Sequence, residues 1–573
     1  DDKRNSLFAK FYARVDVPFI KGLSYTINFG NNYRWARRFN SDEGDGAGTA
    51  FKMNSSAYDW TLDNILSYKT TIADKHNIDA TFVYGARENE YEETMAQGIG
   101  FSNQELTYNS LEQAETFTAT SDAWEESYVY QMGRLAYNYA DKYYLTATLR
   151  RDGFSAFPDG NKTALFPSAA LGWVVSEENF MRDSFANYLK LRLSYGANGN
   201  LINRYASSAL VTSEAAYVDG STSLIGQEAR ELANPNLVWE STTGFNYGID
   251  FGIFNNLVSG SLEYYNTTTD DLIFGFVIPE ATGFSSILSN IGEVKNTGFE
   301  ASLNINPLRT DNFNWNLGIV FATNQNEITA LPGQDNNDNG LVDVNAGSFN
   351  DQFLEIGESI GAIYNYEQDG FWQISDFQAG LIEDFQIGSE RLVDQNGDGV
   401  IDTSDLVVVG RTEPAYQFSI SNQFTYKQFD LSFLLNSVQG GQDGYLGEQN
   451  VWEGGIGTLS AAVLGNFYRE INFWTPNNTN PDFRSPASFQ EAANFRPWED
   501  RSFVRLQDIS LSYNLDSNLT DKLGMGNCRL YVSGKNLITW TDWNGWDPET
   551  NTGIALAGRP VMRSIALGLD ISF

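Results

Sequence analysis

The chain ends in Val561-Met-Arg-Ser-Ile-Ala-Leu-Gly-Leu-Asp-Ile-Ser-Phe573. Large apolar side chains occupy every second position from Ile565 to Phe573, with small or polar side chains between them. Because successive side chains of a strand point to opposite faces, this segment has one face for an apolar medium and one for water. The alternation recurs along a chain that has no apolar core segments, which favours an outer-membrane barrel over a water-soluble sandwich.

The composition excludes several classes of protein. The 573 residues carry 73 acidic and 37 basic side chains, a formal charge of -36, which disfavours binding to nucleic acid. One cysteine, Cys528, allows no internal disulfide, and one histidine, His76, leaves little scope for a histidine metal centre or a Ser-His-Asp hydrolase. We expect Cys528 to be a small strand residue and His76 a solvated turn residue. No apolar run reaches the length of about 18 residues that a transmembrane helix needs.

Alternation, together with enrichment in Tyr, Phe, Val, Ile and Thr, predicts about 17 strands. They are expected near 6–16, 22–37, 55–70, 77–93, 127–139, 143–151, 164–175, 187–198, 238–251, 256–271, 292–306, 313–325, 415–427, 429–440, 501–514, 528–539 and 561–573.

The predicted connections alternate between short and long. Short ones are expected near 17–21, 71–76, 140–142, 176–186, 252–255, 307–312, 428 and 515–527. Long ones are expected near 38–54, 94–126, 152–163, 199–237, 272–291, 326–414, 441–500 and 540–560. Bacterial barrels have short periplasmic turns and long extracellular loops. If the last strand ends in the periplasm, residue 1 lies outside and an odd number of strands, about five for a 22-stranded barrel, precedes it.

Seven sequence blocks occur in a fixed order over about three quarters of the chain. They are Leu135–Ser155, Phe166–Trp173, Leu189-Lys-Leu-Arg-Leu-Ser-Tyr-Gly-Ala-Asn-Gly-Asn200, Trp239-Glu-Ser-Thr-Thr243, Asn296-Thr-Gly-Phe-Glu300, Phe503-Val-Arg-Leu-Gln-Asp-Ile-Ser-Leu511 and Leu530–Trp540. From about residue 127 onward the sequence therefore resembles the SusC/RagA family of TonB-dependent outer-membrane transporters of Bacteroidetes. The first 126 residues resemble it only through their strand pattern.

The resemblance implies an all-β, transmembrane antiparallel barrel in the cell outer membrane, with about 17 strands of a 22-stranded barrel in residues 1–573. It implies import of oligosaccharides or peptides with a SusD-like surface lipoprotein, in a dimer of transporter–lipoprotein pairs surrounded by outer-membrane lipid. Energy would come from TonB-ExbB-ExbD. The sequence shows no recognisable plug domain or TonB box, so we expect a partial or split chain, with coupling supplied from elsewhere.

Two other functions stay open. The chain could be a structural or scaffold subunit of a larger outer-membrane complex, with no transport role of its own. An extracellular enzyme is the weaker alternative, because no pair among the 73 acidic residues is singled out by its spacing. We therefore predict no catalysis, and the sequence does not name the cargo.

One segment resembles an EF-hand calcium loop: Asp394-Gln-Asn-Gly-Asp-Gly-Val-Ile-Asp-Thr-Ser-Asp405. Its spacing predicts Ca²⁺ ligands in the side chains of Asp394, Asn396, Asp398, Asp402 and Asp405 and in the backbone carbonyl of Val400. Asp405 stands where a bidentate Glu is usual, so we expect weak binding. The alternative is an Asn/Asp/Gly-rich turn without an ion.

Two long loops, 372–414 around this motif and 441–500, are expected on the extracellular side. Six tryptophans fall in the last two outer loops: Trp452, Trp474, Trp498, Trp540, Trp543 and Trp546. They could stack on sugars or pack against a lipoprotein lid, or they could belong to the interfacial girdle or to loop cores. Mild helical spacing predicts a short outer helix over 459–467.

Overall fold

A computed structural model describes residues 2–42, 48–101, 105, 107–182, 184–213, 216–219, 222–284, 286–331, 354–444, 472–481, 484, 485, 488, 498–522, 524–543, 547–549 and 561–572. Seventeen long strands form one sheet. They are β1 Asp2–Asp16, β2 Leu23–Asp42, β3 Thr49–Ile72, β4 His76–Phe101, β5 Ala114–Tyr139, β6 Tyr143–Phe154, β7 Thr163–Val174, β8 Ala186–Asn200, β13 Glu240–Ile253, β14 Val258–Asp270, β17 Glu293–Arg309, β18 Phe313–Ala330, β23 Tyr416–Tyr426, β24 Phe429–Gln439, β27 Phe503–Asn514, β28 Asn527–Thr541 and β29 Ser564–Ser572.

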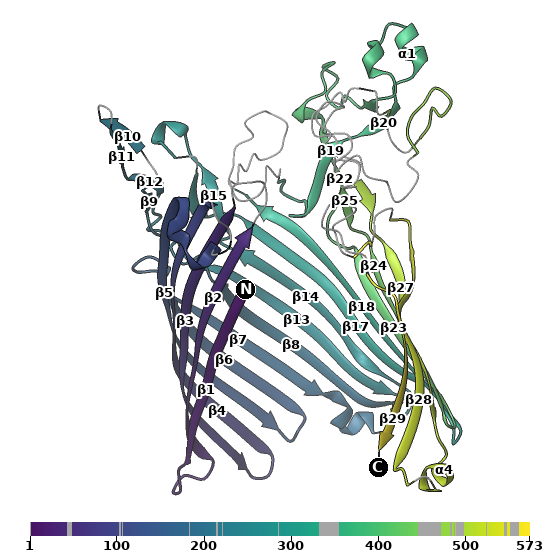
Figure 1. The fold of residues 1–573 in the computed structure, drawn as a ribbon. Coiled ribbons are helices and arrows are strands. Elements are labelled where there is room, and N and C mark those ends of the chain that lie inside the picture. The colour runs from purple at the N-terminus through teal and green to yellow at the C-terminus, as the bar shows by residue number, and fades with distance from the viewer. Residues whose placement is uncertain are drawn as a thin grey trace.

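Each strand of this sheet pairs antiparallel with the next one along the wall. The order runs from β1 through β8, then β13, β14, β17, β18, β23, β24, β27, β28 and β29. Figure 1 shows the sheet curling into a barrel wall, with β1 and β29 as its two edges. The predicted fold class and the prediction of about 17 strands are therefore confirmed.

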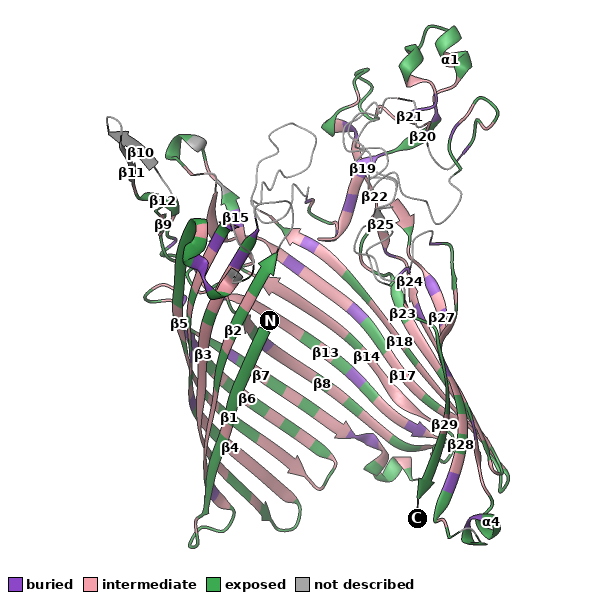
Figure 2. Ribbon diagram, in the orientation of Figure 1, coloured by how far each residue is buried: buried purple, intermediate pink, exposed green. Residues whose placement is uncertain are grey.

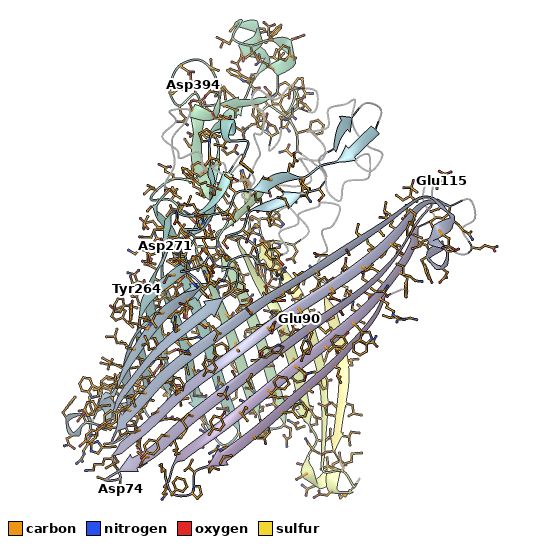
Figure 3. All side chains as sticks on the ribbon, turned by 90° about the vertical axis from the view of Figure 1, so that its left-hand side faces the viewer. Asp74, Glu90, Glu115, Tyr264, Asp271 and Asp394 are labelled. Atoms are coloured by element: carbon orange, nitrogen blue, oxygen red, sulfur yellow. The ribbon has the colours of Figure 1, made fainter. Side chains whose placement is uncertain are left out.

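The connections divide between two ends of the wall. Short turns such as 73–75, 140–142 and 427–428 lie at one end, which we call the short-turn end. The connections 201–239, 331–415 and 440–502 all lie at the other, the long-loop end. In Figure 3, Asp74 marks the short-turn end, whereas Glu115 and Asp394 lie at the long-loop end. The predicted alternation of short and long connections is confirmed from β8 onward. It was wrong at 38–54 and 152–163, because the connections there are only 43–48 and 155–162, no longer than the turns 17–22 and 175–185 beside them. The expectation of further strands before residue 1 stays a prediction.

The register gives the wall two chemically different faces. One row of directly paired residues crosses six strands from β17 to β6, and every member is a large apolar side chain at least 37% exposed: Phe299, Tyr264, Tyr247, Leu193, Leu171 and Leu145. The adjacent row, on the opposite face, reads Glu300, Glu263, Gly248, Arg192, Gly172 and Tyr144. Exposed aromatic and aliphatic rows suit lipid, and the polar face suits a wet lumen. Figure 2 shows most of the wall as intermediate or exposed, with little of it buried.

Three strands exceed their predicted lengths by the widest margins. β3, β4 and β5 contain 24, 26 and 26 residues, whereas a tilted strand crosses a bilayer with about 9–11. The prediction of a loop over 94–126 was therefore wrong, since β4 continues to Phe101 and β5 begins at Ala114. Beyond the membrane both faces meet water, so the apolar alternation fades while the ladder of hydrogen bonds continues.

Among the residues that the structure describes, six pairs of short strands, which we call hairpins, lie at the long-loop end. The hairpins pair β9 (Leu210–Thr212) with β12 (Glu228–Glu231), β10 (Ala216–Asp219) with β11 (Thr222–Ile225), β15 (Ile273–Val277) with β16 (Ser286–Asn290), β19 (Ala362–Tyr366) with β22 (Leu406–Arg411), β20 (Gln368–Phe371) with β21 (Glu390–Leu392), and β25 (Gln442–Gly444) with β26 (Trp498–Asp500). Helix α1 spans Ile374–Gln378, and helix α4, at the short-turn end, spans Ser517–Lys522. Within the described ranges, no helix has the length and hydropathy to span a bilayer.

The single histidine and cysteine both lie on wall strands. Cys528 is a buried residue of β28, as predicted. His76 is the first residue of β4, with its Nδ1 2.8 Å from the hydroxyl of Tyr137 and its ring 4.9 Å from that of Tyr139. The prediction of a solvated turn residue was wrong, because pairing with β5 brings two tyrosines against the imidazole.

Candidate functional site

The polar face carries a charged bridge that spans three strands. Arg192 of β8 donates two hydrogen bonds of 2.8 Å to Asp250 of β13 and a third, also 2.8 Å, to Glu263 of β14. The residue between them is Gly248, where an added Cβ would lie 2.7 Å from the guanidinium carbon. Asn246 also donates to Glu263, at 3.2 Å. The glycine therefore gives the guanidinium room to cross β13, and the bridge fastens β8 to β14.

A second bridge, nearer the amino end of the chain, also passes over a glycine. The ring of Tyr130 on β5 lies over Gly85 of β4, where an added Cβ would be 2.3 Å from the ring. The Tyr130 hydroxyl donates to Asp63 of β3. The guanidinium of Arg150 lies 4.9 Å from the centre of the same ring. Four neighbouring strands are thus linked on the polar face.

A pocket of about 450 Å³ opens on the polar face near the long-loop end. Strands β4 to β8 and the adjoining loop supply its lining, which includes Arg87, Tyr128, Tyr130, Arg150, Asp152 and Trp239. Arg87 is paired with Tyr128, and Tyr130 with Asp152, so the wall register alone brings these side chains together. We call it the upper pocket.

A small buried core supports the upper pocket. Tyr128 stacks on Phe154 at a centroid distance of 4.4 Å, and Phe157 stacks on Trp239 at 4.5 Å. Phe154, Phe157 and Trp239 are each less than one-tenth exposed and form one cluster with Phe166. Close packing of this kind restricts side-chain motion, so the upper pocket has a rigid base.

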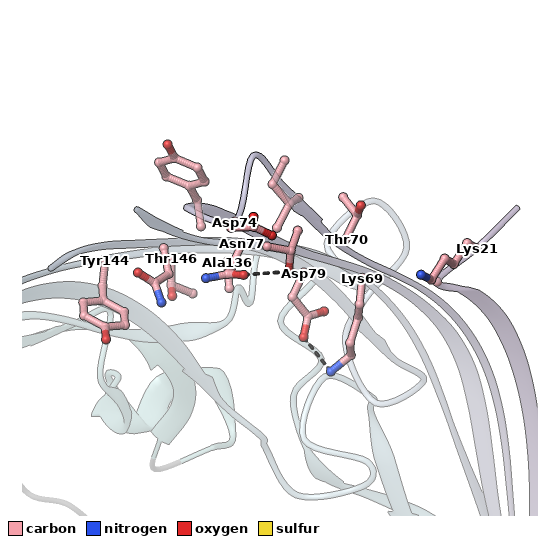
Figure 4. Close-up of a pocket in the computed structure, with 14 residues that line it drawn as sticks. Lys21, Lys69, Thr70, Asp74, Asn77, Asp79, Ala136, Tyr144 and Thr146 are labelled. Atoms are coloured by element: carbon pink, nitrogen blue, oxygen red, sulfur yellow. Dashed lines mark hydrogen bonds and ion pairs between the residues drawn. The ribbon is translucent and has the colours of Figure 1, made fainter. Parts of the chain in front are cut away.

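A second, wider pocket of about 760 Å³ lies at the short-turn end, and we call it the lower pocket. Its residues come from the first two turns and the strands beside them, as Figure 4 shows. Lys69 and Asp79 form an ion pair of 2.7 Å across β3 and β4. Tyr144 lies beneath the ammonium group of Lys190 at 4.8 Å. The polar face thus carries recessed polar surface near both of its ends.

Two long loops meet at the long-loop end. Trp474 is 4% exposed, and its indole N–H donates to the side-chain oxygen of Gln373 at 3.3 Å. Ser485 N–H donates to the carbonyl of Gly388 at 2.8 Å. Arg484 and Glu390 form an ion pair of 3.5 Å in which both side chains are less than one-tenth exposed. We call residues 354–411 with 472–488, as far as the structure describes them, the outer-loop assembly.

Burial alters one carboxyl of this assembly. Desolvation raises the pKa of Glu390 above its ordinary value, while a main-chain N–H and the guanidinium of Arg484 oppose the shift. Uptake of a proton by Glu390 is therefore easier in the folded assembly than in an unfolded chain.

The outer tryptophans have several environments. Trp474 and Trp543 are buried, at 4% and 6% exposure, as expected of loop cores. Trp540 is 52% exposed on β28, and Trp498 is part of the short strand β26. Trp452, Trp546 and the helix predicted over 459–467 lie outside the described residues, as does most of the predicted loop 441–500.

The predicted calcium loop lies in the part of the outer-loop assembly that is remote from the wall, where Figure 3 marks Asp394. Asp394 accepts main-chain N–H bonds from Gly397 at 2.6 Å and Gly399 at 2.7 Å. Asn396 and Asp398 accept from the main chain two residues ahead, both at 2.8 Å, and Asp402 accepts from Ser404 at 2.8 Å. These side chains therefore brace the loop backbone.

Asp405 is the only one of these carboxylates that is fully buried. It accepts from Gln395 N–H at 2.8 Å and from Asp402 N–H at 2.9 Å. Val400 is 57% exposed. In the part of the chain that the structure describes, no three acidic, histidine or cysteine side chains gather into a group that could hold a metal ion. Calcium binding by Asp394, Asn396, Asp398, Val400, Asp402 and Asp405 thus stays a prediction.

Sequence reasoning missed both bridges and the upper pocket. Arg192, Asp250 and Glu263 are far apart in sequence, and nothing in their spacing relates them. A signal was available in retrospect, because Gly85 and Gly248 each interrupt a well-formed strand. A glycine inside a strand often marks the close approach of another group.

Comparison with known proteins identifies the same architecture. Residues 2–537 match the family model described as "TonB dependent receptor-like, beta-barrel". The chain is similar to TonB-dependent receptor P3 of Formosa agariphila, with 33% identity over all of this chain and 58% of that protein. It is also similar to TonB-dependent receptor SusC of Bacteroides thetaiotaomicron, with 28% identity over all of this chain and 56% of that protein. The chain therefore spans somewhat more than half the length of these relatives.

Solved structures agree on the fold. The RagAB peptide transporter superposes with a TM-score of 0.77 at 24% identity, covering all of this chain and 62% of the matched one. The "closed-closed" state of the RagAB peptide importer gives a TM-score of 0.79 at 22% identity. The relatives matched here are described as receptors and transporters.

Proposed function

Because the chain belongs to the TonB-dependent receptor-like β-barrel family, in its SusC/RagA group, we propose that it forms the barrel wall of an outer-membrane importer of oligosaccharides or peptides. The observation that carries the proposal is that the wall has two chemically different faces. One face presents rows of exposed apolar side chains, and the other presents polar side chains with charged bridges and a pocket. A polar cargo needs a wet path lined by hydrogen-bonding groups through the bilayer.

The long-loop end is the outward side in this proposal, since long loops of such barrels are extracellular. A SusD-like surface lipoprotein would cover that end, in a dimer of transporter–lipoprotein pairs. TonB-ExbB-ExbD would drive import through a plug and TonB box in the part of the relatives' length that this chain does not span.

The calcium loop is a further part of the proposal. Asp394, Asp398, Asp402 and Asp405 provide oxygen donors of the type that a hard cation prefers, on the extracellular side where calcium is abundant. An ion there would stiffen this loop of the outer-loop assembly.

The first experiment is an intact-mass measurement, with peptide coverage, of the outer-membrane complex that contains this chain. We expect a longer polypeptide, or a co-purifying chain, that carries the plug and the TonB box. Deletion of the gene should then abolish uptake of one class of labelled oligosaccharide or peptide, and a protonophore should do the same. A 64.0 kDa chain without such a partner, together with unchanged uptake after deletion, would favour the scaffold function.

A further inference from the structure

The upper pocket presents the guanidinium of Arg87, which forms no ion pair with any residue that the structure describes. We propose that this pocket is a subsite for an anionic group, a carboxylate or a sulfate, carried by an acidic oligosaccharide cargo. The inference rests on the proposed import function and adds the charge class of the substrate. Its residues come from strands β4, β5 and β6 and the segments beside them.

Arg87 is the centre of the subsite. Its Nε donates to the side-chain oxygen of Asn89 at 3.0 Å, and its guanidinium carbon lies 5.4 Å from the centre of the Tyr128 ring. Tyr128 is itself stacked on the buried Phe154. These contacts hold the guanidinium in place but leave its two terminal nitrogens without an acceptor among the described residues. A fork of free N–H groups matches a carboxylate or a sulfate in geometry and in charge.

The carboxylates around the upper pocket are already occupied. Asp152 accepts a bidentate pair of bonds from Arg150, at 2.7 and 2.7 Å. Asp63 accepts from the Tyr130 hydroxyl. Both oxygens of Glu126 are used, one by Asn89 at 2.9 Å and the other by Arg204 at 3.3 Å. Asp152 and Glu126 thus each have an arginine partner, and none of these carboxylates is bonded to the guanidinium of Arg87.

Hydrogen-bonding groups surround the cation. Thr148, Ser168 and Asn198 line the upper pocket with hydroxyl and amide groups, and Trp239 contributes an indole ring. The volume of about 450 Å³ lies within the usual range for small-molecule sites, about 300–1,000 Å³. Hydroxyl, amide and aromatic groups beside an arginine suit a ring that bears many hydroxyls and one acidic group.

The wall also disfavours a peptide in this pocket. Extended peptides are commonly bound by adding a strand to a free sheet edge. Each strand from β4 to β8 is paired on both sides, so the upper pocket offers no such edge. Recognition there depends on side chains, which favours the oligosaccharide.

The test is a binding measurement on the intact complex purified from outer membranes. Isothermal titration calorimetry would compare an oligogalacturonide, a sulfated galactan oligosaccharide, a neutral maltooligosaccharide of equal length and an oligoglutamate peptide. The variants are Arg87→Gln, the charge-preserving Arg87→Lys, and Arg529→Gln. Arg529→Gln is the matched control, because it removes the same charge from the polar face of β28, far along the wall.

We expect the wild-type complex to bind at least one acidic oligosaccharide more tightly than the neutral one, with affinity that falls as salt rises. Arg87→Gln should weaken that binding about tenfold or more, Arg87→Lys less, and Arg529→Gln little. The preferred acidic probe distinguishes carboxylate from sulfate. Equal affinity of wild type and Arg87→Gln, or preference for the neutral sugar or the peptide, would overturn the anionic subsite while import stands. A complex that binds none of the probes, in cells whose uptake survives deletion of the gene, would instead overturn the proposed function.

Discussion

The barrel wall and the outer-loop assembly are held together by different means. In the wall, backbone ladders join every strand to its neighbours, and side chains such as Arg192 add bridges over glycines. In the outer-loop assembly, individual side chains hold the structure together: Asp394 braces its own loop, and Glu390 and Trp474 join the two long loops. The wall therefore depends on periodic pattern and the outer-loop assembly on single residues. Substitutions should accordingly have graded, face-dependent effects in the wall and local effects in the loops.

The largest effect is expected on the apolar face of the wall. Leu193→Lys places a charge within the apolar row of β8, whereas Ser194→Lys, one residue further on, places it on the polar face. We expect Leu193→Lys to destabilise the protein by about 2 kcal/mol or more, because a lipid-facing charge must leave water. Ser194→Lys should cost far less. Urea unfolding of the full-length protein in lipid vesicles measures both, and equal losses would contradict the assignment of faces.

A smaller effect is expected at a bridged glycine. Gly85→Ala would put a methyl group 2.3 Å from the Tyr130 ring, so the ring must leave Gly85 and its bond to Asp63. We expect a loss of about 1–3 kcal/mol in the free energy of unfolding, as for other overpacked sites. Gly133→Ala is the matched control, because nothing lies within 4 Å of its added Cβ. The same unfolding assay should separate the two variants, and a neutral Gly85→Ala would show that the bridge adds no stability.

In the outer-loop assembly, the effect should be local. The double variant Asp394→Ala/Asp398→Ala removes acceptors for three main-chain N–H groups. At about 1 kcal/mol for each lost bond, we expect faster proteolysis within 372–414 and no change in unfolding of the barrel. Asp384→Ala is the control from the same loop.

The same proteolysis experiment, repeated with and without calcium, tests the ion site. If the loop binds the ion, calcium should slow proteolysis of the wild type and have no effect on the double variant, with a chelator reversing the protection. Unchanged protease sensitivity of the wild type with and without calcium would count against the ion site.

The smallest effect is expected from pH. The pKa of Glu390 is raised in the folded assembly, so the folded state binds the proton more tightly than the unfolded chain does. The contribution of this group to stability is present below the ordinary pKa of 4.5 and is lost as pH rises through the raised value. Proteolysis of 354–411 should therefore slow as pH falls from 7 toward 5, measured with an acid-tolerant protease. A Glu390→Gln variant should lack this dependence, and an identical pH profile in the two proteins would exclude Glu390 as its source.

Much of the wall was predictable from the sequence, for a physical reason. A strand between lipid and water must alternate apolar and polar side chains. The sequence of segments such as 187–198 and 561–573 therefore predicts both the strand and the direction in which each face points. The prediction weakened at β4 and β5, where the strands leave the membrane and polar residues occupy both faces. The predicted alternation of loop lengths therefore holds only from β8 onward, because the longer strands before it leave short connections such as 43–48 and 155–162 at the long-loop end.

The candidate site was far less predictable. The calcium motif is local, so its six residues could be named from spacing, yet spacing does not determine whether their oxygens turn toward an ion or toward the main chain. The upper pocket has no local signature at all. Arg87, Tyr128 and Arg150 occupy one patch only because the registers of β4, β5 and β6 place them there.

By itself, the sequence determined the β architecture, the apolar and polar faces, the alternation of short turns and long loops from β8 onward, and the family. These features depend on period and composition, which are properties of neighbouring residues. Only the tertiary structure decided which glycine lies beneath which side chain, which carboxylates are paired, and which guanidinium nitrogens have no acceptor among the residues that the structure describes. Those features depend on the register between strands. Register is set when segments far apart in the sequence pair, so the residues next to a side chain in the sequence do not determine which partners it contacts.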